Sequence, residues 1–353
     1  MKDRIIRWYH PNQILSELPG ETQRNYYLDN LKFILIILVV SSHFAMKLDF
    51  VNGINYLVKF IYIFHMPCFI FINGFLAKRM NEGGKLRVDK IMITFWMYLI
   101  FKIVNFVLSY LFEEEASLSL FRDRSAPWYL FSLCIWYLAI PVLERIKTKY
   151  LIFGSFLLGL LVGYLSSFGI LFSLSRVFVF FPFFIIGFCI SKEQLEEFLD
   201  KRYRIFAALI LIITFLAIAI FWGWLAPIED IIYGTSSYEK VLEGLYPYGI
   251  LIRAAWYVLA LVLSASLMLL VPRTRLSFSC LGERTLQVYM THIWVRNVLV
   301  YIGFFAFVEE QPIYVSVLVL VGSVLLTFIL SNLWLKKLFD FFMFPKLFSK
   351  VLK

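Results

Sequence analysis

The chain has 353 residues, of which 61% are hydrophobic and only 16% are charged. Soluble domains are about 45–50% apolar and about 25% charged, so the composition excludes a soluble protein built around one core. The net charge of +10 would suit a nucleic-acid partner, but the basic residues alternate along the chain in a pattern that membrane topology explains instead.

Long apolar stretches follow one another along the whole chain. A helix needs about 20 mainly apolar residues to cross about 30 Å of hydrocarbon, and each helix satisfies its own backbone hydrogen bonds in lipid. We therefore predict an all-α polytopic membrane protein with about ten transmembrane helices around a polar internal cavity. The predicted spans lie near 31–48, 55–77, 91–112, 127–144, 151–170, 172–190, 205–225, 249–271, 285–307 and 313–335.

The charges in the connections predict which side each connection faces. Basic residues precede the first span and follow the second, fourth, sixth and eighth, whereas acidic residues such as Glu229 and Glu310 lie between them. This positive-inside pattern places both termini in the cytoplasm. We expect a cytoplasmic segment over 1–28 that can lie on the inner membrane surface, a transmembrane domain over 29–335, and a basic cytoplasmic tail over 336–353.

The first span carries ionisable residues, which are costly in hydrocarbon and tend to face a protein interior. Lys32 and His43 are eleven residues apart on the same side of the helix, about 16 Å along the axis at 1.5 Å per residue. Asp29 lies one turn before Lys32. Lys32 is expected at the cytoplasmic edge of the membrane, and His43 beyond its middle.

Other spans carry polar residues as well. They are His65 and Asn73 in the second span, Lys102 in the third, Arg176 in the sixth, Arg253 in the eighth, and Tyr289, His292 and Arg296 in the ninth. Three intramembrane histidines, together with polar faces on several helices, favour a shared internal cavity.

These residues also have structural explanations. Lys32 and Arg176 lie near span ends, where a long side chain can reach the interface. Lys102 is too deep for that, but it could be a paired structural lysine. A single intramembrane histidine more often forms a hydrogen bond between helices than it catalyses a reaction.

Five motifs stand in order along the chain. They are Tyr27-Leu28-Asp29-Asn30-Leu31-Lys32 with Ser42-His43; Phe64-His65-Met66-Pro67 with Asn73-Gly74-Phe75; Trp128-Tyr129-Leu130 with Pro141; Arg176 with Phe181-Pro182-Phe183-Phe184 and Gly187; and Leu281-Gly282-Glu283-Arg284-Thr285-Leu286 with Tyr289 and His292. Together they resemble the membrane acyltransferase family 3, most closely its branch of fucose 4-O-acetylases and envelope polysaccharide O-acetyltransferases. Asn73 stands where that branch usually has serine.

The resemblance implies a membrane O-acyltransferase in the inner (plasma) membrane of a bacterium. It would move an acyl group, usually acetyl, from cytoplasmic acyl-CoA to a hydroxyl of an envelope or surface glycan. Since histidine titrates near the working pH, His43 is the expected general base or transient acyl carrier. The other implied roles are catalytic support from His65 and His292, donor binding by Lys32, Asp29 and Lys102, and acceptor binding by Arg176, Asn73, Tyr289 and Arg296.

The expected partners are acyl-CoA (acetyl-CoA as acyl donor), a glycan or lipid-linked glycan, and membrane lipids, with a homodimer left open. No nucleic acid is expected. No metal is expected either, since the four cysteines show neither CxxC nor metal-ligand spacing.

Two other classes of protein remain open. An exporter or transporter of a glycan or lipid-linked precursor would also need a polar cavity, but the chain shows no internal repeat and the Asp29, Lys32 and His43 arrangement has no obvious use in transport. A pH-responsive membrane protein would use the histidines without forming an acyl product.

Overall fold

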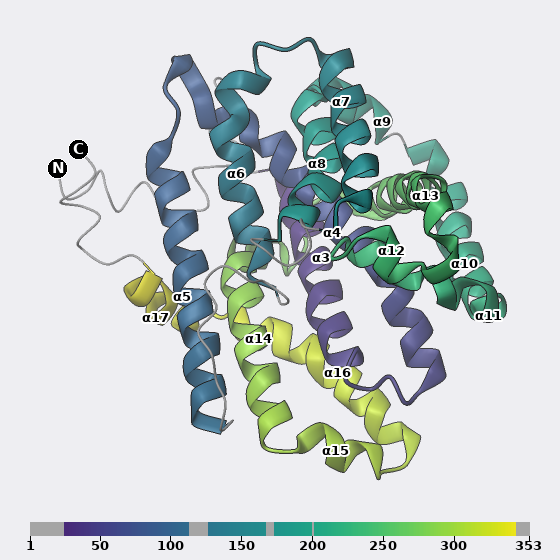
Figure 1. The fold of residues 1–353 in the computed structure, drawn as a ribbon. Coiled ribbons are helices and arrows are strands. Elements are labelled where there is room, and N and C mark those ends of the chain that lie inside the picture. The colour runs from purple at the N-terminus through teal and green to yellow at the C-terminus, as the bar shows by residue number, and fades with distance from the viewer. Residues whose placement is uncertain (1–24, 113–125, 167–172, 200, 344–353) are drawn as a thin grey trace. The chain divides into compact units, whose positions relative to one another are not determined.

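The structure is a computed structural model that describes residues 25–112, 126–166, 173–199 and 201–343. Every regular element in these ranges is a helix (Figure 1), so the all-α prediction is confirmed for the described part of the chain. The helices belong to two units, and we describe each unit by itself. The first comprises the described residues up to Leu48 and from Val271 onward, and the second comprises Asp49–Leu270.

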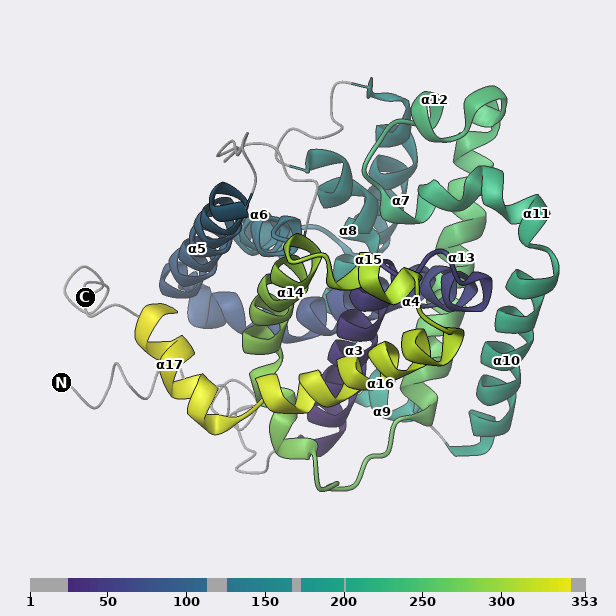
Figure 2. The ribbon, with the colours of Figure 1, turned by 90° about the horizontal axis from the view of Figure 1, so that it is seen from below.

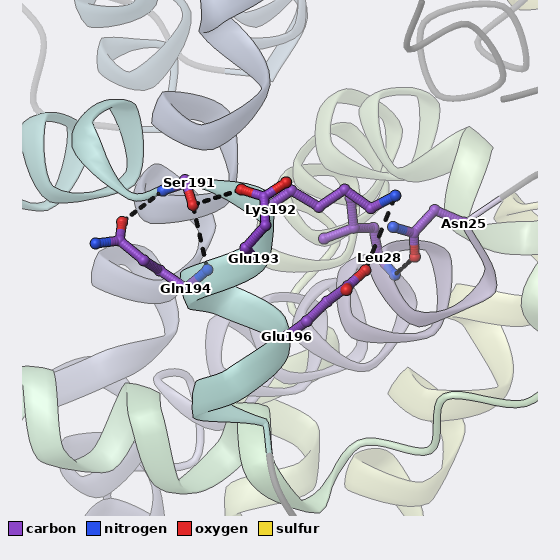
Figure 3. Close-up of polar contacts among 7 residues, drawn as sticks. All are labelled: Asn25, Leu28, Ser191, Lys192, Glu193, Gln194 and Glu196. Atoms are coloured by element: carbon purple, nitrogen blue, oxygen red, sulfur yellow. Dashed lines mark hydrogen bonds and ion pairs between the residues drawn. The ribbon is translucent and has the colours of Figure 1, made fainter. Parts of the chain in front are cut away.

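The first unit is organised around α3 (Tyr26–Ala45). The side chain of Asn25 caps this helix by accepting a hydrogen bond from the Leu28 N–H at 3.2 Å (Figure 3). Three other elements pack against α3 (Figures 1 and 2), namely the 3-10 helix η7 (Ser279–Arg284), α14 (Thr285–Tyr301) and α16 (Ile313–Leu330). The short α15 (Phe304–Glu309) precedes α16, and α17 (Leu333–Met343) follows it.

The start of α3 and η7 approach so closely that only glycine fits between them. A Cβ on Gly282 would lie 2.1 Å from the carbonyl oxygen of Asp29. The Asn30 side chain stabilises the same contact. Its amide donates to the Pro272 and Thr274 carbonyls, each at 2.9 Å, and its oxygen accepts from the Ser279 hydroxyl at 2.6 Å. The first and last of the five motifs therefore form one packed contact in this unit.

At the centre of the second unit, α4 (Asn52–Ala77) crosses α8 (Leu174–Cys189) in direct backbone contact. A Cβ on Gly74 would lie 2.0 Å from the Phe184 carbonyl oxygen, and a Cβ on Gly187 would lie 2.0 Å from the Phe71 carbonyl oxygen. Small residues allow this close approach between membrane helices. The second and fourth motifs thus meet at a pair of reciprocal glycine contacts.

The other long helices of the second unit pack around this crossing. Helix α7 (Thr148–Leu161) lies on α8, α13 (Gly249–Leu270) lies on α4, and α10 (Arg204–Ile220) lies on both α13 and α4 (Figure 2). Helix α5 (Val88–Phe112) packs on α6 (Trp128–Leu143).

Short helices connect these elements. They are η1 (Lys78–Gly84), η2 (Val162–Tyr164), α9 (Lys192–Phe198), η4 (Lys201–Tyr203), α11 (Trp222–Leu225), η5 (Ala226–Tyr233), α12 (Tyr238–Val241) and η6 (Glu243–Tyr248). Helix α9 begins with a capping box, in which the Ser191 hydroxyl accepts from the Gln194 N–H and the Gln194 side chain accepts from the Ser191 N–H (Figure 3).

Five helical stretches of the described chain are long and apolar enough to cross a membrane, namely Tyr26–Ala45, Asn52–Gly84, Val88–Phe112, Gly244–Leu270 and Ile313–Leu330. The number rises to seven if two bent pairs each count as one span: α8 with α9, bent by 100°, and α10 with Trp222–Tyr233, bent by 83°. The chain thus has the helices of a membrane protein.

Each of the ten predicted spans contains a helix, but five of these helices do not qualify as a span by themselves. Helices α8 and α10 qualify only within the bent pairs, and α6, α7 and α14 do not qualify. Helices α6 and α7 have 16 and 14 residues, which at 1.5 Å per residue give about 24 and 21 Å, short of a hydrocarbon layer of about 30 Å. Helix α14 has 17 residues and carries several polar side chains, including His292 and Arg296. The count of ten spans stays a prediction.

The predicted terminal segments fall largely outside the described residues. This applies to 1–24 of the expected inner-surface segment and to 344–353 of the expected tail. Helix α3 begins within the first of these segments, at Tyr26, and α17 covers the first residues of the second.

Candidate functional site

Two of the three histidines that lie in predicted spans meet in the first unit. His43, near the end of α3, has its Nδ1 atom 2.8 Å from Nε2 of His292 in α14. The two imidazole rings are nearly parallel, with an interplanar angle of 7° and centroids 5.1 Å apart. His292 is fully buried, whereas His43 is partly exposed.

The hydrogen-bond partners determine the tautomers of this pair. Nδ1 of His292 lies 2.7 Å from the carbonyl oxygen of Val288, one helical turn earlier. A carbonyl only accepts, so this Nδ1 carries a proton and Nε2 of neutral His292 is an acceptor. His43 must then donate from its Nδ1, and the lone pair of neutral His43 is on Nε2.

This arrangement suits proton transfer. A general base needs an accessible lone pair and a fixed orientation, and a third group often holds the base in place. Here the Val288 carbonyl fixes His292, and His292 fixes the tautomer of His43. His43 Nε2 can therefore take a proton from a hydroxyl group or attack an activated carbonyl.

Two other predicted site residues flank the pair on α14. Tyr289 is buried, and its ring centroid is 6.3 Å from that of His292. Arg296, one turn after His292, donates a 2.6 Å hydrogen bond from Nη2 to the side chain of Asn297.

Lys32 and Asp29 form an ion pair on α3, three turns from His43, with 3.0 Å between the Lys32 Nζ and Asp29 Oδ1 atoms. The Asp29 side chain has no exposed surface, and that of Lys32 is 13% exposed. Asp29 also belongs to the contact with η7. The fold thus holds the Asp29 backbone at η7, and the Asp29 carboxylate pairs with the ammonium group of Lys32.

In the second unit, Asn73 and Arg176 contact the third motif. Asn73 donates from its side-chain amide to the Tyr129 hydroxyl at 2.5 Å and to the Phe69 carbonyl at 2.8 Å. The Arg176 guanidinium lies 5.1 Å from the ring centroid of Trp128. The second, third and fourth motifs therefore form one cluster of side chains.

A group that the sequence did not single out extends this cluster. Arg176 donates from Nε to the Tyr233 carbonyl at 3.2 Å. Lys59 lies 2.8 Å from the Glu229 carboxylate and donates to the Tyr233 hydroxyl at 3.1 Å. Tyr129 and Trp128 stood in a recognised motif, but Lys59, Glu229 and Tyr233 lie in no motif, so only the fold could bring them together.

His65 and Lys102 have partners within their own helices in the second unit. Nδ1 of the buried His65 lies 2.8 Å from the Ile61 carbonyl, and the Tyr62 ring meets the imidazole edge to face at 4.8 Å. The Lys102 ammonium lies 5.9 Å from the Tyr98 ring centroid. This hydrogen bond of His65 thus lies within its own helix and not between helices, and this contact of Lys102 is with an aromatic ring of its own helix.

Within the described ranges, no three or more His, Cys, Asp or Glu side chains are grouped as a metal site would require. The predicted site residues instead form two sets. His43, His292, Tyr289, Arg296, Lys32 and Asp29 belong to the first unit, and His65, Asn73, Arg176 and Lys102 belong to the second.

Comparison with known proteins identifies the family. A family model described as an acyltransferase domain matches residues 25–332, which include all five motifs. No curated protein and no solved structure matches the chain. The match extends from the cap of α3 through the end of α16, so the chain belongs to acyltransferase family 3 and is a membrane acyltransferase.

Proposed function

We propose that the protein transfers an acyl group, acetyl above all, from cytoplasmic acyl-CoA to a hydroxyl group of a cell-envelope or surface glycan. Family membership supports acyl transfer itself. The observation that carries the proposal further is the His43–His292 pair, because its hydrogen bonds put a basic nitrogen on His43 Nε2.

His43 is the general base in this proposal. A sugar hydroxyl is a weak nucleophile and must lose its proton as it attacks a thioester. His43 Nε2 accepts that proton while the new C–O bond forms and the C–S bond breaks, and it then returns the proton to the departing thiolate. The products are an O-acyl ester and free coenzyme A. In a second version, His43 Nε2 attacks the thioester and the coenzyme A thiolate leaves. The hydroxyl oxygen then takes the acyl group from Nε2 as the N–C bond breaks, and the thiolate takes up the hydroxyl proton.

The ion pair of Lys32 and Asp29 is proposed for donor binding. An ammonium group is a point charge that binds phosphate, and coenzyme A carries phosphates. Asp29 is a positioning residue, because its buried carboxylate holds Lys32. Lys102 is a further cation that we propose for binding of the acyl donor.

Acceptor binding is proposed for Arg176, Asn73, Tyr289 and Arg296. Support comes from the contacts of Arg176 with Trp128 and of Asn73 with Tyr129, which combine polar groups with flat aromatic faces. The hydroxyl groups of a sugar can bind to the polar side chains, and the apolar faces of its ring can pack on the aromatic rings. His65 is the supporting histidine in the second unit.

The decisive experiment follows label from acetyl-CoA into envelope glycan with purified full-length protein in lipid. We expect His43→Ala to lower transfer by about 10²–10⁴-fold, the usual contribution of a general base, while membrane insertion stays normal. Lys47→Ala is the matched control, because Lys47 is exposed just after the same helix.

Wild-type transfer by His43→Ala would rule out the role of His43. If the wild-type protein neither hydrolyses nor transfers labelled acetyl-CoA, the exporter alternative gains instead, since an exporter needs no acyl donor.

A further inference from the structure

Arg253, in the second turn of α13, is a buried cation that the proposed reaction does not use. It has no exposed surface. In the parts of the chain that the structure describes, its Nε, Nη1 and Nη2 atoms have neither a hydrogen-bond partner nor an ion pair. A guanidinium group has five N–H donors and keeps its charge at any working pH, so this group needs acceptors from elsewhere.

The nearest aromatic contact does not replace them. The Arg253 guanidinium lies 4.9 Å from the ring centroid of Tyr238. Burial raises the pKa of Tyr238 to about 12, so the phenol is neutral and supplies no counter-charge. A cation–π contact recovers only part of what burying an unpaired charge costs.

The fold holds Tyr238 firmly in this place. A Cβ on either Gly163 or Gly249 would come within 2.3 Å of the Tyr238 ring. The Tyr238 hydroxyl donates to the Leu160 carbonyl at 2.7 Å. The ring therefore forms a fixed wall beside the guanidinium group.

A second buried donor lies one helical turn further along α13. Trp256 is 4% exposed, and its Nε1 atom also has no hydrogen-bond partner among the described residues. Residues three apart are neighbours on a helix surface. Both Arg253 and Trp256 only donate, so a ligand that satisfies them must supply acceptor atoms.

The surroundings of Trp256 are aromatic and continue to a proposed acceptor residue. The Trp256 ring packs on Phe180 with centroids 5.7 Å apart, and Phe180 packs on Trp128 at 5.0 Å. Trp128 lies under Arg176. A row of flat rings thus runs from Trp256, one turn after Arg253, to Arg176 within the second unit.

We propose that Arg253 anchors a buried binding site for an oxyanion, which is either a carboxylate or a phosphate group. Trp256 is the second hydrogen-bond donor of this site. Guanidinium binds either group through two parallel hydrogen bonds. The assignment of this oxyanion to the acceptor rests on the proposed function. The acceptor is then an acidic glycan or a glycan that carries phosphate.

The test measures thermal unfolding of the full-length protein in detergent. The additions are sodium glucuronate, inorganic phosphate, and glucose with sodium chloride at matched ionic strength. We expect glucuronate, phosphate or both to raise Tm saturably by about 3 °C or more, with no rise from glucose and salt. A rise in Tm with glucuronate alone indicates that the ligand is the carboxylate of an acidic sugar, and a rise with phosphate alone indicates a phosphate group. No rise in Tm with either addition overturns the proposal.

Variants locate the effect. Arg253→Met should abolish the rise while leaving Tm without additions equal or higher, because it removes an unpaired buried charge. Arg145→Gln, at an exposed arginine of the same unit, should keep the full rise. An undiminished rise in Arg253→Met overturns the proposal.

If the Arg253→Met protein fails to accumulate, Arg253→Lys tests the site instead, because lysine keeps the charge but cannot form two parallel hydrogen bonds. We expect at least tenfold weaker binding of the active anion, and unchanged binding overturns the site. The readout is independent of acyl transfer, so failure of the proposed reaction and failure of this site are distinguished.

Discussion

His292 influences His43 through one hydrogen bond between two ring nitrogens. Without an acceptor at Nε2 of His292, the Nδ1 atom of His43 loses this partner, and the preference for a proton on Nδ1 weakens. The fraction of protein with the lone pair on the reacting nitrogen would fall. His292 is thus a positioning residue in the proposed reaction, since it acts through His43.

Replacing His292 separates this role from a merely structural one. We expect His292→Leu to lower kcat by about 10²-fold, the lower end of general-base contributions, with KM for acetyl-CoA unchanged. His292→Gln should retain more activity than His292→Leu, because its amide oxygen can accept from His43. The measurement is steady-state transfer with both variants.

Thr291→Val is the control, since the half-buried Thr291 hydroxyl donates to the Gln287 carbonyl of its own helix and to no other described residue. Equal activities of the Leu and Gln variants, with a loss of folded protein in both, would contradict the positioning role.

The sequence could identify the titratable residues but not their pairing. His43 and His292 are 249 residues apart, and no local pattern predicts that they share a hydrogen bond. The Val288 carbonyl that fixes the tautomer is a backbone group, so its role has no signature in the residue types. Arg253 was visible as a polar residue in a span, but its lack of acceptors depends on every neighbour around it.

Among the elements, the crossing of α4 and α8 depends on glycine. The backbones meet at Gly74 and Gly187, and each missing Cβ would overlap a carbonyl oxygen of the other helix. The same helices carry Asn73 and Arg176, so the crossing also sets where these side chains lie.

Alanine at this crossing should be destabilising. We expect Gly74→Ala to lower the free energy of unfolding by about 1–3 kcal/mol, the usual cost of overpacking, because the neighbour is backbone and cannot move aside. The measurement is the denaturation midpoint of purified protein. Gly154→Ala in α7 is the matched control, because nothing lies within 4 Å of its Cβ position.

Alanine at that open helical position should be neutral or stabilising by about 0.5–1 kcal/mol. A Gly74→Ala protein as stable as the wild type would show that the two helices can separate without cost.

Helix positions were largely predictable from apolar stretches, and each predicted span contains a helix. The helix contacts were not predictable, because Gly74, Gly187 and Gly282 in their motifs give no information about their partners. The bend of 100° between α8 and α9 was also missed. The two helices are separated only by Ile190 and Ser191, and the sequence signal there is the Ser191 capping box, which marks a new helix start.

For the whole molecule, the open question is how many helices cross the membrane. The apolar stretches predict ten spans and the charge pattern places both ends inside, whereas length and apolar character qualify five to seven helical stretches of the described chain. The count of seven leaves out the short α6 and α7 and the polar α14, and the count of five also leaves out α8 and α10. Short or polar helices can cross where they are enclosed by protein, so composition alone does not decide.

Cysteine labelling in intact cells decides it. In a variant without native cysteines, we expect a membrane-impermeant thiol reagent to label Glu310→Cys from outside, and to label Lys85→Cys and Arg145→Cys only after lysis. All three positions are exposed. Arg145 follows α6, so labelling there from outside would mean that α6 does not cross after α5.

Glu310 follows α14 and α15, so protection of Glu310→Cys in intact cells would mean that α14 does not cross. Lys85→Cys serves as the internal reference, because it follows α4, which qualifies as a span by itself.

The hydrogen bonds of the Asn30 side chain, which donates to the Pro272 and Thr274 carbonyls and accepts from the Ser279 hydroxyl, have a consequence for biosynthesis. Helix α3 leaves the ribosome early, but its partners α14 and α16 are translated only after all of Asp49–Leu270. At about 5–20 residues per second, the nascent α3 waits roughly 12–50 seconds for His292. During this interval its buried face must be shielded by lipid, by the insertion machinery or by a chaperone, and a prematurely terminated polypeptide never completes the histidine pair.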